Sequence, residues 1–198
     1  MLVINSLVDN RSECYCSVVK SKVKICWYRI EVDYIFYIYV VWFTMSGSRI
    51  VILENIRSAY NVWNVIRTAD SLWWNVWITG YTPSPVDNPK VCKTSLWAEN
   101  TVWLRQFDFA SDAIKEARNM WLEVIAAELT KSSVSLWDYS CKLEKWVAVI
   151  FGNEVDWVME KTLKEVDAVV EIPMQGIKES MNVGQSTAIF MWELRNRK

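Results

Sequence analysis

Residues 147–154 read VAVIFGNE, and this stretch gives the clearest indication of the fold. Its first five residues are apolar and mostly β-branched, which is typical of a strand buried on both faces of a parallel sheet. Gly152 and Asn153 follow at once, so the strand ends in a tight turn. A strand of this kind needs parallel neighbours and covering helices, and the stretch therefore predicts an α/β domain.

The segments around this strand alternate between strand and helix patterns. Short apolar runs predict further strands at 50–53, 75–79, 123–127 and 168–172. Apolar residues that recur every three or four positions, together with the capping residues and composition, predict helices over 61–72, 110–121 and 180–195. Ser111 and Ser180 are expected to cap the starts of the last two helices.

The alternation predicts a mainly parallel sheet flanked by helices. Ligands of such sheets bind beyond the carboxyl ends of the strands. We therefore expect the functional site in the loops that follow Ala127, Phe151 and Ile172.

Composition narrows the function classes. The chain has 198 residues, 52 % of them apolar, and a net charge of −1, which suits one globular domain and is unlike a strongly basic nucleic-acid-binding domain. Histidine is absent, which excludes Ser-His-Asp and Cys-His nucleophile pairs and His-ligated metal sites, and no metal is expected. The five cysteines form no C-x-x-C pair and indicate the thiols of a reducing compartment, so we expect a cytoplasmic protein.

The chain divides near Met45. Residues 1–44 contain no glycine or proline and end in an apolar run at 34–43, which is too short to span a bilayer. We interpret 1–44 as an N-terminal extension, or as a consequence of start-site choice because Met45 resembles a fresh start. A membrane-surface anchor is an alternative for this segment, although no membrane partner is expected for the domain at 45–198.

Three motifs carry the functional signal: NVWNVIRTAD at 61–70, GNEVDW at 152–157 and IPMQGIKESMNVG at 172–184. Taken alone, the first motif also fits an ordinary amphipathic helix, the second a strand-to-helix turn and the third a capped helix start. In this order they resemble the motifs of the SpoU/TrmH family, the 2′-O-ribose RNA methyltransferases of the SPOUT superfamily. The stretch 82–99 also resembles a family segment, and the likeness covers about 49–194 but not 1–44.

The resemblance implies a SPOUT-type α/β knot, in which the C-terminal part threads a trefoil knot. It implies transfer of a methyl group from S-adenosylmethionine to a ribose 2′-hydroxyl of tRNA or rRNA. A homodimer is expected, with the active site completed across its interface. The alternative is a non-catalytic SPOUT-like module for RNA binding or dimerisation.

The resemblance also implies roles for individual residues. Arg67 would handle the 2′-hydroxyl and the neighbouring phosphate, Asn61 would place that arginine, and Glu154 would orient the active-site loop. Ser180 and Asn182 would organise the third motif as part of the catalytic set. The expected cofactor-binding residues are Glu128, Leu129, Gly152, Ile172, Met174, Ser180 and Met181. The expected RNA-binding residues are Arg67, Lys90 and Lys93, although the two lysines equally fit a solvated loop.

The tryptophan count is unusual. The chain has 13 Trp and only 5 Gly, whereas average usage would give roughly 14 Gly in this length. Four tryptophans (Trp63, Trp73, Trp97 and Trp157) stand where the family pattern has glycine, and Trp121 stands where a glycine is expected to end a helix. The codon UGA is read as tryptophan in one variant genetic code and as glycine in another. We therefore hypothesise that these five positions are glycine in the native protein.

Overall fold

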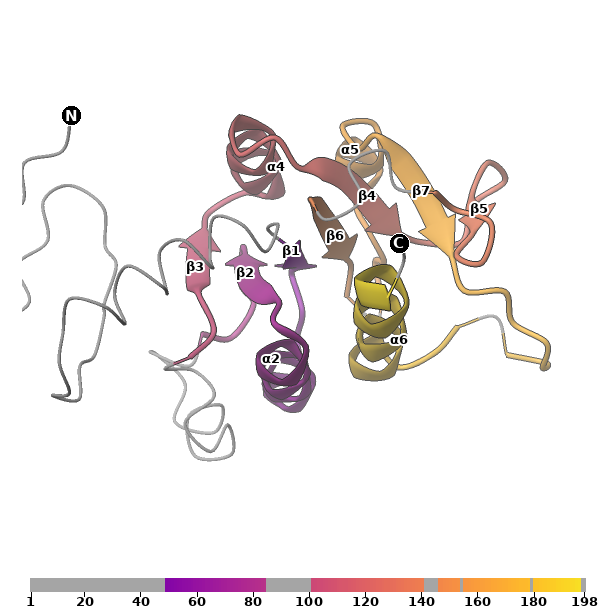
Figure 1. Ribbon diagram of the computed structural model, residues 1–198, viewed down its shortest axis with the longest axis horizontal. Coiled ribbons are helices and arrows are strands. Elements are labelled where there is room, and N and C mark those ends of the chain that lie inside the picture. Colours follow the sequence, from indigo (N-terminus) through magenta and orange to yellow (C-terminus); the bar gives the residue numbers. More distant parts are fainter. Residues whose placement is uncertain (1–48, 85–100, 141–145, 154, 179, 197–198) are drawn as a thin grey trace, which may run out of the picture.

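The computed structural model describes residues 49–84, 101–140, 146–153, 155–178 and 180–196, and Figure 1 shows their arrangement. The strands are β1 (Arg49–Glu54), β2 (Asn75–Thr79), β3 (Leu104–Phe107), β4 (Glu123–Ala127), β5 (Val134–Ser135), β6 (Val147–Phe151) and β7 (Ala168–Glu171). The helices are α2 (Ala59–Leu72), α4 (Ala110–Asn119), α5 (Glu160–Leu163) and α6 (Val183–Asn196).

One parallel sheet of seven strands, in the order β3-β2-β1-β6-β4-β7-β5, forms the centre of the molecule. The predicted α/β class with a mainly parallel sheet is thus confirmed. All five residues of β6 are buried, and this strand pairs with β1 on one side and β4 on the other. The stretch that predicted the fold is therefore an inner strand of the sheet.

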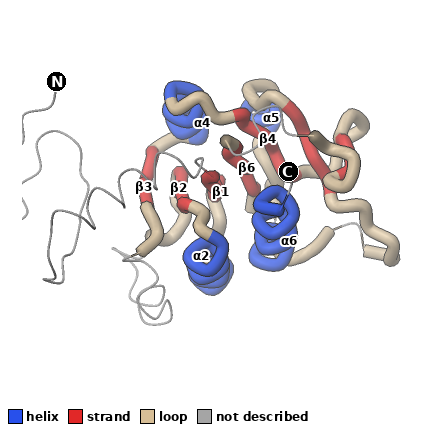
Figure 2. Tube along the Cα trace, viewed as in Figure 1, coloured by secondary structure: helices blue, strands red, loops and turns tan. Residues whose placement is uncertain are grey.

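Helices cover both faces of the sheet, with α2 and α6 on one face and α4 and α5 on the other (Figure 2). Alternate residues of each strand enter one of two cores because side chains alternate across a strand. Val51 and Leu53 of β1 pack with α2 and α6, whereas Ile50 and Ile52 pack with α4.

Most of the predicted elements have the predicted bounds. The strands at 75–79, 123–127 and 147–151 are confirmed residue for residue, and those at 50–53 and 168–172 differ by one or two residues. The sequence patterns missed β3, β5 and α5, which are short and carry no continuous apolar run.

Both predicted helix caps were wrong. The helix α4 begins at Ala110, so Ser111 lies inside its first turn, and the residue before it, Phe109, makes no side-chain cap bond. The helix α6 begins at Val183 rather than at Ser180. Its cap is Asn182, whose Oδ1 accepts a hydrogen bond from the Gly184 amide at 2.9 Å.

Some sequence-based expectations fall on residues outside the described part of the chain. They concern the extension 1–44, the two lysines Lys90 and Lys93, Trp97, Glu154 and most of the stretch 82–99.

Candidate functional site

A cavity of about 330 Å³ opens at the carboxyl ends of β4, β6 and β7. Its lining comes from the loops after these three strands and from the first turns of α6. The lining residues are Ala127, Glu128, Leu129, Phe151, Gly152, Asn153, Trp157, Val170, Glu171, Ile172, Met174, Ser180, Met181, Asn182, Val183, Ser186 and Phe190. Ligand pockets of proteins have this size and this mixture of apolar walls and a few polar groups.

All seven residues that the sequence predicted to bind a cofactor line this one cavity, as does Asn182. They come from three separate loops, and the sheet topology brings them together. The sequence missed other lining residues, among them Asn153, Glu171 and Ser186. Asn153 could have been found, because it directly follows the glycine that ends the buried strand.

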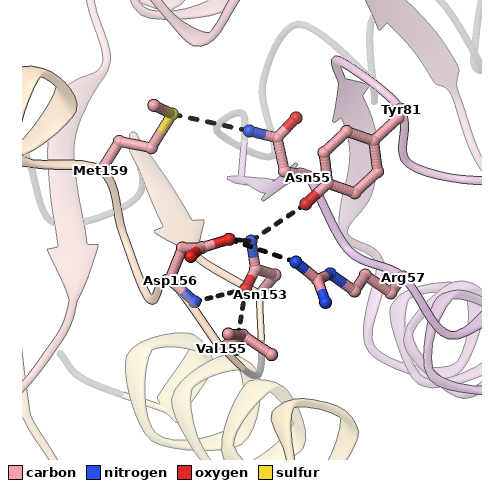
Figure 3. Close-up of polar contacts among 7 residues, drawn as sticks. All are labelled: Asn55, Arg57, Tyr81, Asn153, Val155, Asp156 and Met159. Atoms are coloured by element: carbon pink, nitrogen blue, oxygen red, sulfur yellow. Dashed lines mark hydrogen bonds and ion pairs between the residues drawn. The ribbon is translucent and has the colours of Figure 1, made fainter.

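The loop after β6 is held in shape by Gly152 and Asn153 (Figure 3). A Cβ atom on Gly152 would lie 2.0 Å from the backbone carbonyl of Trp157, so only glycine fits this close approach. The Asn153 Oδ1 accepts hydrogen bonds from the amides of Val155 (2.8 Å) and Asp156 (2.6 Å). The Trp157 amide donates to the Asn153 carbonyl at 3.2 Å, which closes the turn.

Arg57 and Tyr81 contact this loop from the segments that follow β1 and β2, as Figure 3 shows. The Asn153 Nδ2 donates to the Tyr81 hydroxyl at 3.2 Å, and Arg57 forms an ion pair with Asp156 at 3.4 Å. Both partners of the ion pair are more than half exposed, so the pair contributes little stability. No sequence motif pointed to Arg57 or Tyr81; their positions just after β1 and β2 become informative only once the strand order is known.

Asn182 joins the first and third sequence motifs. Its Nδ2 donates to the Oδ1 of the buried Asn61 at 3.2 Å, while its Oδ1 caps α6. The structure therefore brings Asn61 of α2 to the rim of the cavity.

We expect Asn182→Ala to lower the free energy of unfolding by about 1–2 kcal/mol, because the helix loses its cap. The melting temperature should fall by roughly 2–8 °C. Thermal unfolding followed by circular dichroism would measure this change. Asn182→Ser retains a capping oxygen and serves as the control; equal losses in both variants would contradict the capping role.

Glu128 places a carboxylate in the wall of the cavity. It accepts hydrogen bonds from the amides of Leu129 at 2.8 Å and Val158 at 3.0 Å. Burial disfavours the charged form and raises the pKa of Glu128 above its ordinary 4.5, although the two backbone hydrogen bonds oppose this shift.

This shift predicts a pH dependence of stability. A carboxyl whose pKa is raised by folding stabilises the fold fully below pH 4.5, and this contribution is lost as the pH rises through the folded-state pKa. The free energy of unfolding of the wild type should therefore decrease, relative to that of Glu128→Gln, as the pH is raised from 4.5. Urea denaturation of both proteins across this range would measure the difference, and parallel curves would contradict the prediction.

Arg67 is exposed on α2, where its guanidinium lies 5.5 Å from the centroid of the Trp63 ring. It is not among the residues that line the cavity. It lies six positions after Asn61, and six helical positions rise by about 9 Å. Arg67 thus lies nearly two turns further along α2 than Asn61.

Two features are absent from the described ranges. No helix there is both long and apolar enough to cross a membrane. No group of three His, Cys, Asp or Glu side chains there is arranged to hold a metal ion.

The sequence profile of the SpoU rRNA Methylase family matches residues 48–192, nearly three quarters of the chain. The chain belongs to this family. The match contains all three motifs and every element of the sheet. Residues 1–47 lie outside it.

Curated relatives of this SpoU chain are named as RNA methyltransferases. A 23S rRNA (guanosine-2′-O-)-methyltransferase of Neisseria meningitidis is 28 % identical over 149 residues, which is 75 % of this chain and 58 % of that protein. A tRNA (guanosine(18)-2′-O)-methyltransferase of Thermus thermophilus is 26 % identical over 151 residues, 75 % of this chain and 74 % of that one. The SpoU chain thus spans little more than half of the Neisseria relative.

Solved structures share the fold. The tRNA-modifying enzyme TrmH/SpoU of A. aeolicus superposes with a TM-score of 0.65 at 22 % identity, covering 75 % of this chain and 74 % of that one. An AdoMet-bound rRNA methyltransferase of Sinorhizobium meliloti gives a TM-score of 0.69 at 24 % identity, covering 76 % and 57 %. These similarities establish a SPOUT-methyltransferase fold for the SpoU chain.

Proposed function

We propose that this chain is an S-adenosylmethionine-dependent methyltransferase that methylates a ribose 2′-hydroxyl of tRNA or rRNA. The observation that carries the proposal is the single cavity at the ends of β4, β6 and β7. It gathers all seven expected cofactor residues in a chain of the SpoU family. The named relatives, which act on tRNA and on 23S rRNA, support this reaction and substrate class.

The cavity fits such a cofactor chemically. Phe151, Val170, Ile172 and Phe190 provide apolar walls for a flat adenine ring. Glu128 and Ser180 provide polar groups that suit ribose hydroxyls and a charged amino-acid tail. The volume of about 330 Å³ lies within the range of small-molecule sites.

When bound, the cofactor supplies a methyl group on a sulfonium, which is already a good leaving group. The protein then has to position the ribose, orient its 2′-hydroxyl toward the methyl carbon and take up the hydroxyl proton, as the oxygen–carbon bond forms and the carbon–sulfur bond breaks. Arg67 would contact the hydroxyl and the adjacent phosphate, and a guanidinium suits this task because it binds phosphate oxygens in a fork geometry. Asn61 and Asn182, joined at the cavity rim, would fix the position of the α2 terminus.

A second copy of the chain would complete this site. Arg67 does not line the cavity of its own chain, so we propose a homodimer in which one protomer provides the cofactor cavity and its partner provides Arg67. We further propose that residues 45–198 form the methyltransferase domain, that its C-terminal part is threaded as a trefoil knot, and that the enzyme works in the cytoplasm. The RNA-facing loop with Lys90 and Lys93, and the orienting role of Glu154, remain part of this proposal.

The test is methyl transfer by the full chain. The protein is incubated with S-adenosylmethionine carrying a labelled methyl group and with either total tRNA or rRNA, and the RNA is digested to nucleosides for mass spectrometry. We expect the label on a 2′-O-methylated nucleoside. Binding of RNA without any methyl transfer would contradict the proposal and favour a non-catalytic module.

A further inference from the structure

Three tryptophans adopt a backbone conformation that tryptophan strongly disfavours. Among the described residues, four non-glycine residues have a positive φ: Asn55 (56°), Trp73 (58°), Trp121 (62°) and Trp157 (62°). Asparagine tolerates the left-handed region, but a bulky side chain there is a genuine outlier because its Cβ crowds the following carbonyl. These three tryptophans are among the five that the sequence marked as glycine positions.

Trp73 and Trp121 end two helices in the same way. The Trp74 amide donates to the Ala69 carbonyl at 2.9 Å after α2, and the Leu122 amide donates to the Ala117 carbonyl at 3.1 Å after α4. Each of these bonds joins residues five positions apart. In addition, the amides of Trp73 and Trp121 each donate to the carbonyl three positions earlier in the chain. This is the Schellman motif, whose left-handed residue is usually glycine. The hydrogen bonds hold the positive φ in place.

Trp157 closes the loop beside the cavity. Its amide donates to Asn153, and its backbone is the surface on which Gly152 packs without room for a Cβ. A change of φ at position 157 would therefore break the turn. The positive φ at Trp157 is therefore part of this turn, although the turn is not a Schellman motif.

Packing of the indole rings does not offset this strain. The exposed fractions are 61 % for Trp73, 82 % for Trp121 and 44 % for Trp157. By contrast, Trp74 and Trp77 are 2 % and 0 % exposed, have no positive φ and fill the core around β2. Trp73, Trp121 and Trp157 therefore differ from these core tryptophans both in backbone conformation and in exposure.

We propose that the native polypeptide carries glycine at positions 73, 121 and 157. These three tryptophans would then be encoded by UGA codons that the organism reads as glycine, which accounts for part of the imbalance between 13 Trp and 5 Gly. This assignment of glycine is independent of the proposed function. It covers three of the five positions of the sequence hypothesis, because Trp63 lies within α2 without a positive φ and Trp97 lies outside the described residues.

The first test determines the codons of the gene and the residues of the native protein at these positions. We expect UGA at codons 73, 121 and 157, and peptides of the protein purified from its own organism should carry glycine at these positions by mass spectrometry. A UGG codon, or a peptide with tryptophan, at any of the three would overturn the assignment for that position.

The second test measures the strain itself. The full chain as written is compared with the triple variants W73G/W121G/W157G and W73A/W121A/W157A. We expect the glycine variant to melt several degrees above the written chain and above the alanine variant, since alanine removes the indole but keeps the Cβ. A glycine variant that melts no higher than the alanine variant would overturn the conformational argument.

Discussion

Replacing Arg67 by alanine is expected to lower the rate of methyl transfer by about 10²–10⁴-fold, the range typical for loss of a positioned catalytic group. Binding of S-adenosylmethionine should be unchanged, because Arg67 does not line the cavity of its chain. Single-turnover assays with labelled cofactor would measure the rate, and calorimetric titration would measure the binding. Arg67→Lys, which keeps the charge but loses the fork of donors, should recover only part of the activity.

The control for this variant is a measurement of its thermal stability. Arg67 is exposed, so Arg67→Ala should retain the melting temperature of the parent chain to within a few degrees. Methyl transfer at the parent rate by this variant would contradict the role of Arg67 and would leave the cavity proposal in place.

Replacing Gly152 by alanine is expected to weaken the binding of S-adenosylmethionine at least tenfold. The new Cβ would meet the Trp157 carbonyl at 2.0 Å and the Val158 amide at 2.2 Å, and both are backbone atoms that cannot rotate away. The loop has to move, and this movement deforms one wall of the cavity. Strain of this kind costs about 1–3 kcal/mol, so the melting temperature should also fall by several degrees.

A matched control is available for this prediction. At Gly176 a Cβ would meet no atom within 4 Å, so Gly176→Ala should change neither the melting temperature nor the cofactor affinity by much. Calorimetric titration and thermal unfolding of both variants would decide the matter. Equal cofactor affinity in the two variants would contradict the importance of the close approach at Gly152.

The same two variants test the proposed homodimer. Chains carrying Arg67→Ala are co-expressed with chains carrying Gly152→Ala, so that mixed dimers form. If the partner provides Arg67, one of the two sites in a mixed dimer combines an intact cavity with an intact arginine. Roughly a quarter of the parent activity should then return in a one-to-one mixture. No recovery in purified mixed dimers would contradict completion of the site across an interface.

The sequence predicted the inner strands well because their signal is local. Residues 147–151 and 124–127 are continuous apolar runs, and runs as short as these favour a buried strand over a helix. The edge strand β3 has the sequence LRQF and is not fully buried, so its pairing with β2 depends on tertiary contacts that no local pattern records. The predicted cap at Ser180 was wrong for a related reason. Ser180 and Asn182 are both good capping residues, and only the path of the backbone decides which of them caps the helix.

The site could be predicted in part. Gly152, Ile172 and Met181 come from motifs that are readable in the sequence, and they line the cavity. Arg57 and Tyr81 could not be found in this way, because neither belongs to a motif quoted above. Their contact with Asp156 and Asn153 arises from the order of β2, β1 and β6 in the sheet.

The pairing of β1 with β6 also has a consequence for synthesis of the protein. Leu53 pairs with Phe151, so the centre of the sheet joins segments separated by roughly 100 residues of chain. While the chain emerges from the ribosome, β1 can pair with β2 early, but its other edge stays open until β6 has been made. During that interval the strand Arg49–Glu54 presents unpaired backbone groups along one edge, and a nascent chain stalled before residue 147 should bind chaperones and aggregate, whereas the full-length chain should not.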